Sequence, residues 1–356
     1  MNLYLIKMNL ILTKDNCHKN KEVNIAMKQI ISCASYGGTG SSAITDLLKE
    51  FTICKSLGDF EFSFLHYPKG IRDLELNILN RNNRLNTSYA IFEFLEMNKK
   101  IEREYKKYFG DEYFDLTKKY IESLIQVSWK GTSELYTSDE NKYLKLLYRI
   151  LNKVFNTIKL KREGVYFQKK NYPLYSCYIS KEKFYENTQN YLEKLFKSLD
   201  KEEKYEKIVL DQLVPSSDIN SYLNYIKNLK VIVVDRDPRD LYILNREFWN
   251  EGWIPQDINS YIEYFRNIRI HQNYEKEDKS KIFRIRFEDL IYSYEETLKK
   301  IILFLELDEK NHLNKKQFFN PEISIKNTNL KSKYSKYVEE ISRIEKELKE
   351  FCYEGY

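Results

Sequence analysis

Glycines cluster in one short stretch of this sequence. Three of the 10 glycines in the 356-residue chain fall between residues 37 and 40, after the apolar run 28–34 and before the helix-compatible segment 41–50. Glycine lets a backbone turn sharply and approach a ligand closely, and the amides that open a helix attract anions. We therefore expect a phosphate or a similar oxyanion to bind to six consecutive residues: Gly37, Gly38, Thr39, Gly40, Ser41 and Ser42.

This loop lacks the lysine of a nucleotide-hydrolysing P-loop. In the pattern Gly-x-x-x-x-Gly-Lys-Ser/Thr, Gly40 takes the last glycine position, Ser41 the lysine position and Ser42 the Ser/Thr position. Because that lysine reaches the β- and γ-phosphates, an ordinary ATPase or GTPase is disfavoured. A glycine-rich turn without any ligand is the alternative interpretation.

A second candidate for anion binding follows the β-branched run 230–234. Two arginines, Arg236 and Arg239, flank Pro238 in the segment Arg-Asp-Pro-Arg-Asp, and a helix is expected next. Ligands of open α/β sheets bind at the carboxyl ends of strands, and an arginine fork binds phosphate bidentately. The pattern predicts that Arg236 faces a second anion. A surface cluster of Asp–Arg ion pairs that caps a helix is the alternative.

Charged residues also follow the alternating segment 281–287, which is typical of a strand. Glu288 could fix Arg236 or Arg239 from a neighbouring strand, and Asp289 or Ser293 could cap the helix that comes next. Because paired buried charges are usually structural, we expect this segment to support the site rather than to react.

The composition narrows the class of protein. The net charge of +6 suits anionic ligands but is too small to argue for nucleic acid. Five scattered cysteines without Cys-x-x-Cys spacing favour reduced thiols in a cytosol, and the four histidines show no metal-ligand spacing. No apolar run approaches the roughly 20 residues of a membrane span. No transmembrane segment is therefore expected, whereas peripheral contact with a membrane stays open.

Strands and helices are expected to alternate around these motifs, which predicts an α/β fold with a three-layer, doubly wound parallel sheet. We expect strands at 28–34, 51–57, 207–214, 230–234 and 281–287. The first and second parts of the core are expected at 27–84 and 202–330, with a helical insertion at 85–201 that acts as a lid or binds an acceptor. The segment 331–356 is expected to form a charged terminal helix over 331–352, and residues 1–26 a tail that need not be ordered.

The three motifs, in this order, resemble those of the P-loop-like sulfotransferase family that uses 3′-phosphoadenosine-5′-phosphosulfate (PAPS). Residues 38–42 occupy the place of its 5′-phosphosulfate loop, and Arg-Asp-Pro-Arg-Asp at 236–240 that of its 3′-phosphate motif. A later motif is matched by Arg-Phe-Glu-Asp-Leu at 286–290. The resemblance covers about 28–70 and 207–306. It implies PAPS as co-substrate, held by the glycine loop, Arg236 and Arg239, without a metal.

Two positions depart from the pattern of that family. Gly38 stands where the family has Lys or Arg, which removes a cation beside the sulfate-bearing group. Leu244 stands where the family often has Ser. Lys326 resembles the basic residue of a late loop that closes over the cofactor, and it is a candidate to replace the missing cation.

Sulfuryl transfer to a hydroxyl also requires a base for the incoming proton. Family members with carbohydrate acceptors place a carboxylate or histidine near the end of the second strand, where this chain has Glu61, His66 and Asp59. Glu61 lies between Phe60 and Phe62, so we expect apolar surroundings that raise its pKa. We rank Glu61 first, His66 second and Asp59 third. An exposed charge at an edge turn is the alternative for Glu61.

The resemblance thus implies a cytoplasmic transferase of polysaccharide biosynthesis that moves a sulfuryl group from PAPS to a hydroxyl. The class of protein suggests a bacterial surface glycan or its lipid-linked precursor as the acceptor. A lysine-less P-loop kinase or other phosphoryl transferase is the alternative enzyme, and an inactive family member that binds a nucleotide or a glycan is the alternative without chemistry. Trp249 and Trp253 could stack on sugar faces or belong to the core.

Overall fold

A five-stranded parallel sheet forms the centre of the protein. The computed structural model describes residues 28–132, 141–160, 167, 172–249, 251–270 and 276–355, so the expected tail 1–26 lies outside the described residues. The strand order is β2-β5-β1-β6-β7, and every neighbouring pair is parallel. The strands span Gln29–Ser35 (β1), Cys54–Glu61 (β2), Lys207–Asp211 (β5), Leu229–Asp235 (β6) and Ile282–Arg286 (β7). The predicted α/β fold with a parallel sheet is confirmed.

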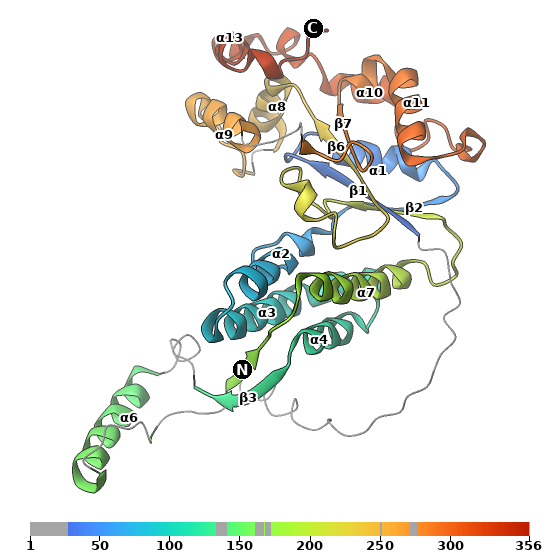
Figure 1. Ribbon diagram of the computed structural model, residues 1–356. Coiled ribbons are helices and arrows are strands. Elements are labelled where there is room, and N and C mark those ends of the chain that lie inside the picture. Colours follow the sequence, from blue (N-terminus) through green and yellow to red (C-terminus); the bar gives the residue numbers. More distant parts are fainter. Residues whose placement is uncertain are drawn as a thin grey trace.

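Helices cover both faces of this sheet, because its central strands are apolar on both sides. One face, with Ile31, Val209 and Ile232, packs against α1 (Ser41–Lys49) and α11 (Tyr294–Leu305). The other face, with Ile208 and Val231, packs against the helical block that connects β2 to β5. Figure 1 shows the sheet between these layers.

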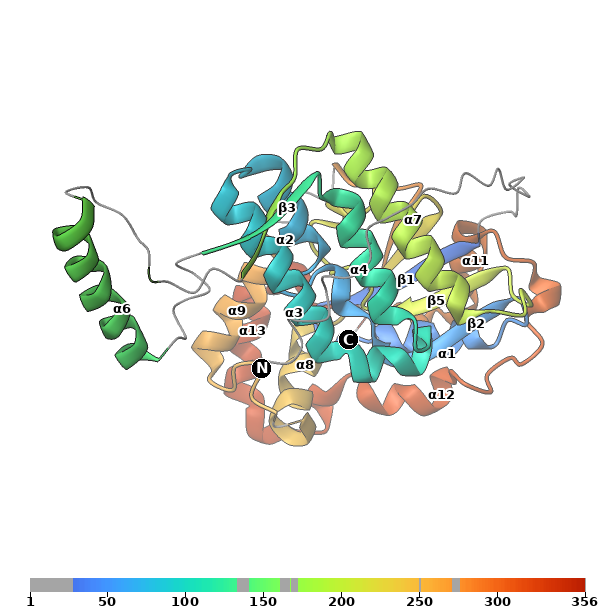
Figure 2. The ribbon, with the colours of Figure 1, turned by 90° about the horizontal axis from the view of Figure 1, so that it is seen from below.

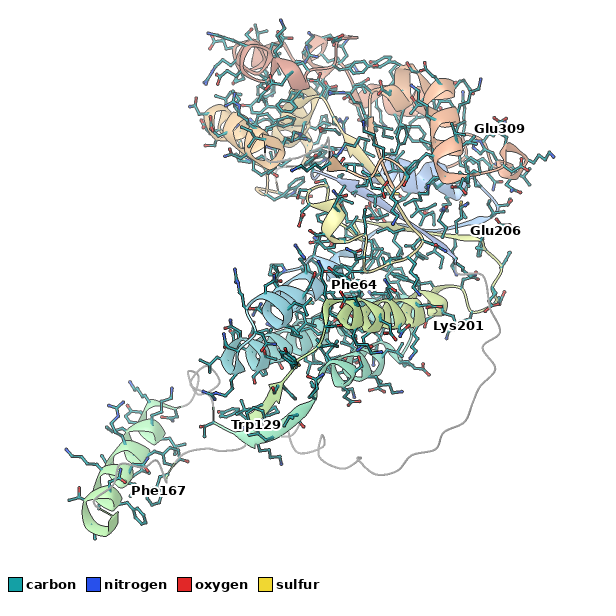
Figure 3. The ribbon with its side chains drawn as sticks, in the orientation of Figure 1. Phe64, Trp129, Phe167, Lys201, Glu206 and Glu309 are labelled. Atoms are coloured by element: carbon teal, nitrogen blue, oxygen red, sulfur yellow. The ribbon has the colours of Figure 1, made fainter. Side chains whose placement is uncertain are left out.

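The helical block contributes one of the two covering layers. Its helices share a single core with the sheet and span Ile71–Glu75 (α2), Arg84–Phe109 (α3), Tyr113–Leu124 (α4) and Lys181–Leu199 (α7). Phe64, labelled in Figure 3, is fully buried where the block meets the sheet. The block therefore completes the core. Its expected role as a lid or acceptor subdomain stays a prediction.

An antiparallel hairpin and one isolated helix extend from this block. The hairpin pairs β3 (Val127–Gly131) with β4 (Tyr172–Ser176), and α6 (Lys142–Phe155) lies in the connection between them. Both Figure 1 and Figure 2 show α6 standing apart from the other helices.

A third group of helices lies beyond the carboxyl end of β6. It comprises α8 (Pro238–Leu244), α9 (Ile258–Ile270) and α13 (Val338–Glu347), which share a core of their own. Two short helices, α10 (Asp289–Tyr292) and α12 (Pro321–Ser324), lie between β7 and α13 in the sequence. The segment 331–352, expected as one charged helix, is divided into 3₁₀ turns around α13. Each turn contains or directly follows a side chain that the core buries, namely Leu330, Tyr337 or Leu348.

Two strand ends differ from the sequence prediction and affect the site. β2 continues to Glu61 instead of ending at residue 57, and β5 ends at Asp211 instead of residue 214. Gln212, directly after β5, has a left-handed backbone with a φ of 51° and therefore ends the strand. As a result, Glu61 and Asp211 lie in register at the carboxyl edge of the sheet.

Candidate anion-binding and active site

The glycine loop joins the end of β1 to the start of α1 at the middle of the sheet. Gly37, Gly38 and Gly40 have φ angles of 84°, 66° and 110°, which side-chain-bearing residues rarely adopt. The first amide of α1 that bonds a backbone carbonyl is that of Ala43, which donates to Gly40. Within the described residues, the amides from Gly38 to Ser42 have no hydrogen-bond partner. The loop thus presents free backbone donors at a helix N-terminus, where an anion is stabilised.

Hydrogen bonds to neighbouring strands hold this loop in place. Thr39 is fully buried, and its hydroxyl donates to the Val234 carbonyl of β6 at 2.6 Å while it accepts the Tyr36 amide at 3.1 Å. Gln212 Nε2 donates to Ser35 Oγ at 2.5 Å and lies 3.4 Å from Ser41 Oγ. The side chains of Thr39 and Ser41 therefore shape the loop, and Ser42 is the exposed hydroxyl.

Aromatic rings pack against the three glycines. A Cβ atom on Gly37 would lie 2.6 Å from the Trp253 ring, and one on Gly38 would lie 2.5 Å from the Trp249 ring. The two indoles are stacked, with ring centroids 6.0 Å apart. Both tryptophans therefore belong to the surroundings of the loop, and the glycines are required by close approach as well as by φ.

Arg236 is the arginine that reaches the loop. It directly follows β6, the neighbour of β1, and only 5% of its surface is exposed. Its guanidinium donates to the Gly38 carbonyl at 3.4 Å through Nη1 and to the Asn327 carbonyl at 2.5 Å through Nη2. β1 and β6 are the strands at which the chain switches direction across the sheet, the place where such sheets bind ligands. The two candidate anion sites of the sequence are thus neighbours.

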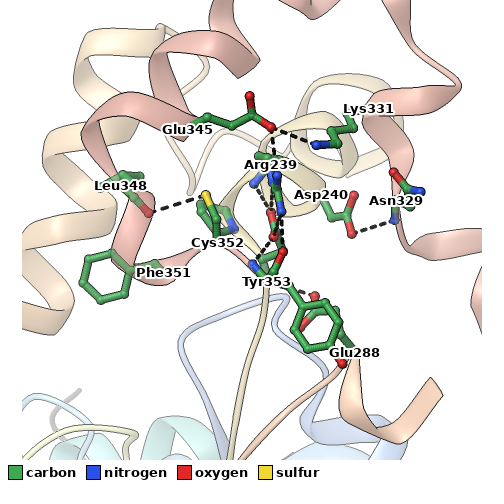
Figure 4. A network of polar contacts seen from close by, with 12 residues as sticks. Arg239, Asp240, Glu288, Asn329, Lys331, Glu345, Leu348, Phe351, Cys352 and Tyr353 are labelled. Carbon is green, nitrogen blue, oxygen red and sulfur yellow. Dashed lines mark hydrogen bonds and ion pairs between the residues drawn. The ribbon is translucent and has the colours of Figure 1, made fainter. Parts of the chain in front are cut away.

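Arg239 takes part in a network of polar contacts with the C-terminal segment (Figure 4). Its guanidinium donates to Asp237 at 2.6 Å, to Glu345 at 2.8 Å and to the Tyr353 carbonyl at 3.0 Å. The Asp237 carboxylate also caps α8 by accepting the Arg239 amide. Through these contacts Arg239 links α8 to the C-terminal segment. This arrangement corresponds to the alternative interpretation of the Arg-Asp-Pro-Arg-Asp segment, a cluster of Asp–Arg ion pairs that caps a helix.

Asp240 and Lys326 connect the same motif to a late loop. The Asp240 carboxylate accepts the amides of Asn329 and Leu330 at 3.0 and 2.7 Å. This anchors the loop whose Asn327 carbonyl accepts from Arg236. Lys326 precedes Asn327 and is exposed, so the structure places a second cation in the loop that touches Arg236.

Residues of the third motif, at 286–290, pack against Arg236 and hold the backbone beside it. The Phe287 ring lies 4.4 Å from the Arg236 guanidinium and also packs against Gly40. Glu288 is fully buried and accepts the Asp237 amide at 2.9 Å, and its carboxylate lies 3.5 Å from Arg286. Burial raises the pKa of Glu288 to about 7. Glu288 thus fixes the backbone of the Arg236 segment rather than the guanidinium of Arg239. Ser293 precedes α11 without a side-chain cap.

Asp211 is a site residue that the sequence did not single out. Only 4% of its surface is exposed, its Oδ1 has no partner among the described residues, and the Ser41 hydroxyl contacts its carboxyl group. Burial, and to a smaller extent the nearby Glu61 carboxylate, raise the pKa of Asp211 to about 7. Asp211 therefore holds or releases a proton near neutral pH beside the loop. Its position directly before Gln212, inside a predicted strand, was the available signal.

The three ranked bases lie at the same edge in different surroundings. Glu61 is exposed at the end of β2, so the predicted apolar surroundings are wrong, because its side chain points away from the rings of Phe60 and Phe62 that pack in the core. His66 is half-buried, and its Nε2 donates to the Gln212 carbonyl at 2.9 Å. Burial lowers the pKa of His66, which favours the neutral ring. Asp59 is exposed on β2.

A polar cavity opens next to the start of the loop. It has a volume of about 590 Å³ and lies between the end of β1, the segment after β5 and helix α9. Its lining includes two tyrosine rings and several hydrogen-bonding side chains: Tyr36, Tyr264, Ser216, Asn220 and Asn267. Such a lining suits a ligand with hydroxyl groups. Within the same described residues, His, Cys, Asp and Glu form no group of three that could hold a metal ion.

Comparisons with known proteins find similarity only among solved structures. No protein-family model and no curated protein sequence matches the chain. Sulfotransferase STF1 from Mycobacterium tuberculosis is 11% identical over 86% of this chain and 78% of its own, with a TM-score of 0.33. The sulfotransferase domain of the Synechococcus olefin synthase is 12% identical over 84% and 86%, with a TM-score of 0.37. Sulfotransferase STF9 from Mycobacterium avium is 11% identical over 85% and 68%, with a TM-score of 0.32. At these low TM-scores, any functional assignment has to rest on the residues of the site itself.

Proposed function

We propose that this protein transfers a sulfuryl group from PAPS to a hydroxyl group. The observation that carries the proposal is the 3.4 Å contact between the Arg236 guanidinium and the Gly38 carbonyl. This contact places the guanidinium of Arg236, which can bind one phosphate, next to the free amides of the glycine loop, which can bind another oxyanion. Both lie between β1 and β6, where the chain changes direction across the sheet. A nucleotide with anionic groups at its 5′ and 3′ positions fits two such neighbouring sites.

In this proposal the amides from Gly38 to Ser42 hold the 5′-phosphosulfate and Arg236 holds the 3′-phosphate. Negative charge that builds on the bridging oxygen is stabilised by the amides and by the N-terminus of α1. Lys326 supplies the cation that Gly38 lacks when the loop at 325–328 closes on the ligand. Arg239 keeps the Arg236 segment rigid.

The proton of the incoming hydroxyl goes to a carboxylate at the same edge. Glu61 remains our first candidate because it is exposed, and therefore accessible to an acceptor. Asp211 becomes the second candidate, because a pKa of about 7 suits a base that works near neutral pH. The cavity lined by Tyr36 and Tyr264 would hold the acceptor, and its hydroxyl-binding side chains favour a carbohydrate such as a surface glycan or its precursor.

Calorimetry with adenosine 3′,5′-bisphosphate (PAP) tests this proposal. Arg236→Ala should weaken PAP binding by roughly 1.5–3 kcal/mol, the value of a hydrogen bond to a charged group, which is about 10- to 150-fold in Kd. Arg266→Ala is the matched control and should leave binding unchanged, because the guanidinium of Arg266 contacts Glu263 and the Glu347 carbonyl, which are not part of either anion site. Thermal unfolding of both variants shows whether the fold is intact. Tight PAP binding that Arg236→Ala leaves untouched would refute our placement of the 3′-phosphate.

Phosphoryl transfer with ATP is the second candidate, and Asp211 is the observation that favours it. P-loop enzymes hold Mg²⁺ between a loop Ser/Thr and an Asp on a neighbouring strand. Asp211 lies on β5, the neighbour of β1, and contacts Ser41, which directly precedes Ser42 in the Ser/Thr position. The same calorimeter separates the two functions. Binding of ATP with Mg²⁺ and no binding of PAP would favour the kinase.

A further inference from the structure

Helix α6 has an apolar face that no described part of the protein covers. None of its residues is buried, although its apolar residues recur with the period of an amphipathic helix. Its contacts to the described chain are those with Phe167: Asn152 Nδ2 donates to the Phe167 carbonyl at 2.8 Å, and the ring of Phe155 lies 5.7 Å from that of Phe167. Figure 3 shows this helix and Phe167 at the far end of the molecule from α13.

The polar and apolar residues of α6 lie on separate faces. At about 100° per residue, the apolar side chains cover an arc of about 200°. Six of them are between 41% and 70% exposed: Tyr143, Leu144, Leu146, Leu147, Ile150 and Val154. The remaining arc carries four basic residues and no acidic one: Lys142, Lys145, Arg149 and Lys153. The other long helices of the block, α3 and α7, carry charges of both signs.

We propose that α6 lies flat on an anionic lipid bilayer, with its apolar face among the acyl chains and its lysines and arginine at the headgroups. A bilayer can accept the whole 200° arc, and exclusively basic polar residues complement anionic lipid. With 14 residues, α6 is too short to cross a membrane, and no described helix is long and apolar enough to do so.

The β3–β4 hairpin, which carries α6, has further exposed side chains that suit the interface between a bilayer and water. Val127 and Trp129 on β3 are 56% and 39% exposed, and Tyr178 just after β4 is 91% exposed. Tryptophan and tyrosine favour the headgroup region of a bilayer. Because α6 is inserted between β3 and β4, these residues lie where the connection that carries α6 begins and ends, and Figure 3 labels Trp129 there.

Pairing of α6 with a second copy of itself is less well supported by these charges. In such a pair, the basic residues of the two helices would lie close together at the edge of the contact, and their like charges would repel each other. A partner protein that binds a helix in a groove also covers a stripe narrower than the 200° apolar arc of α6, so part of the arc would stay exposed to water.

Vesicle co-sedimentation of the full chain tests the proposal. The protein should bind vesicles that contain phosphatidylglycerol and fail to bind pure phosphatidylcholine vesicles. The double variant Leu147→Glu/Ile150→Glu should weaken binding at least tenfold. Arg149→Gln/Lys153→Gln should weaken it about 25-fold, since each basic residue near an anionic surface is worth about fivefold.

Leu303→Glu is the matched control, because Leu303 is 81% exposed on α11, far from α6 in the sequence. It should bind as the wild type does. Since α6 buries no side chain, its variants should keep the wild-type melting temperature, which separates loss of binding from loss of folding. Three results would overturn the proposal: no binding to anionic vesicles, equal binding to neutral vesicles, or a dimer without lipid that Leu147→Glu/Ile150→Glu abolishes.

Discussion

The buried carboxyl group of Asp211 should make the stability of the protein depend on pH. Burial raises its pKa to about 7 in the folded state, against about 4 in an unfolded chain. Between these two values the folded protein keeps a proton that the unfolded chain has released, so the free energy of unfolding falls as the pH rises. The stability that the neutral Asp211 provides is complete below about pH 4 and is lost on the way to about pH 7.

Asp211→Asn removes this titration and nearly keeps the shape of the side chain. A difference of about 3 pKa units at 1.36 kcal/mol per unit amounts to about 4 kcal/mol. Relative to the wild type, the variant should therefore gain about 4 kcal/mol of stability between about pH 4 and about pH 8. Glu288, whose pKa is also raised, titrates in both proteins and cancels in the comparison.

Urea unfolding followed by circular dichroism at several pH values measures this difference. Asp111→Asn is the matched control, because the Asp111 side chain is fully exposed and its replacement should shift stability equally at every pH. A stability difference between Asp211→Asn and wild type that stays constant from about pH 4 to about pH 8 would refute the reasoning, since a buried acid with a raised pKa cannot behave in this way.

Two further predictions concern the loop and the base. Gly40→Ala should destabilise the protein by about 1–3 kcal/mol, because its Cβ would lie 2.7 Å from the Phe287 ring at a φ of 110°. Gly252→Ala is the control, with stability measured by chemical unfolding. Gly252 has a φ of 81° but no atom within 4 Å of the new Cβ, so this substitution should cost only about 1 kcal/mol of stability. Equal losses of stability in the two variants would mean that the contact with Phe287 is unimportant. Glu61→Gln should slow single-turnover sulfation of a hydroxyl acceptor by about 10²–10⁴-fold, as expected for removal of a general base. Glu202→Gln is the control, because Glu202 is also exposed, and it should leave the rate of sulfation unchanged. A wild-type rate for Glu61→Gln would leave Asp211 as the candidate base.

The elements of the core could be predicted because their patterns are local. The run of β-branched residues in β6 and the amphipathic period of α11 each determine one element, and α11 begins directly after Ser293, where a helix was expected. The proximity of Arg236 to the glycine loop was also predictable, since both follow central parallel strands and therefore meet at one edge.

Roles that depend on distant partners could not be predicted. Arg239 is committed to Glu345 and Tyr353, which lie more than 100 residues away in the sequence. Asp211 is buried because β5 lies between β1 and β2, and the strand order cannot be derived from residue types alone. The helical insertion at 85–201 was also expected, but the sequence could not tell that the apolar face of α6 lies outside the core.

The arrangement of the tryptophans has an experimental consequence. The chain has three tryptophans, and two of them, Trp249 and Trp253, pack on the glycine loop. The third, Trp129, lies on the hairpin that carries α6. Tryptophan emission, excited selectively over that of the 30 tyrosines, therefore reports from only two places. In variants that keep one set of indoles, quenching or a blue shift distinguishes nucleotide binding from lipid binding without any attached dye.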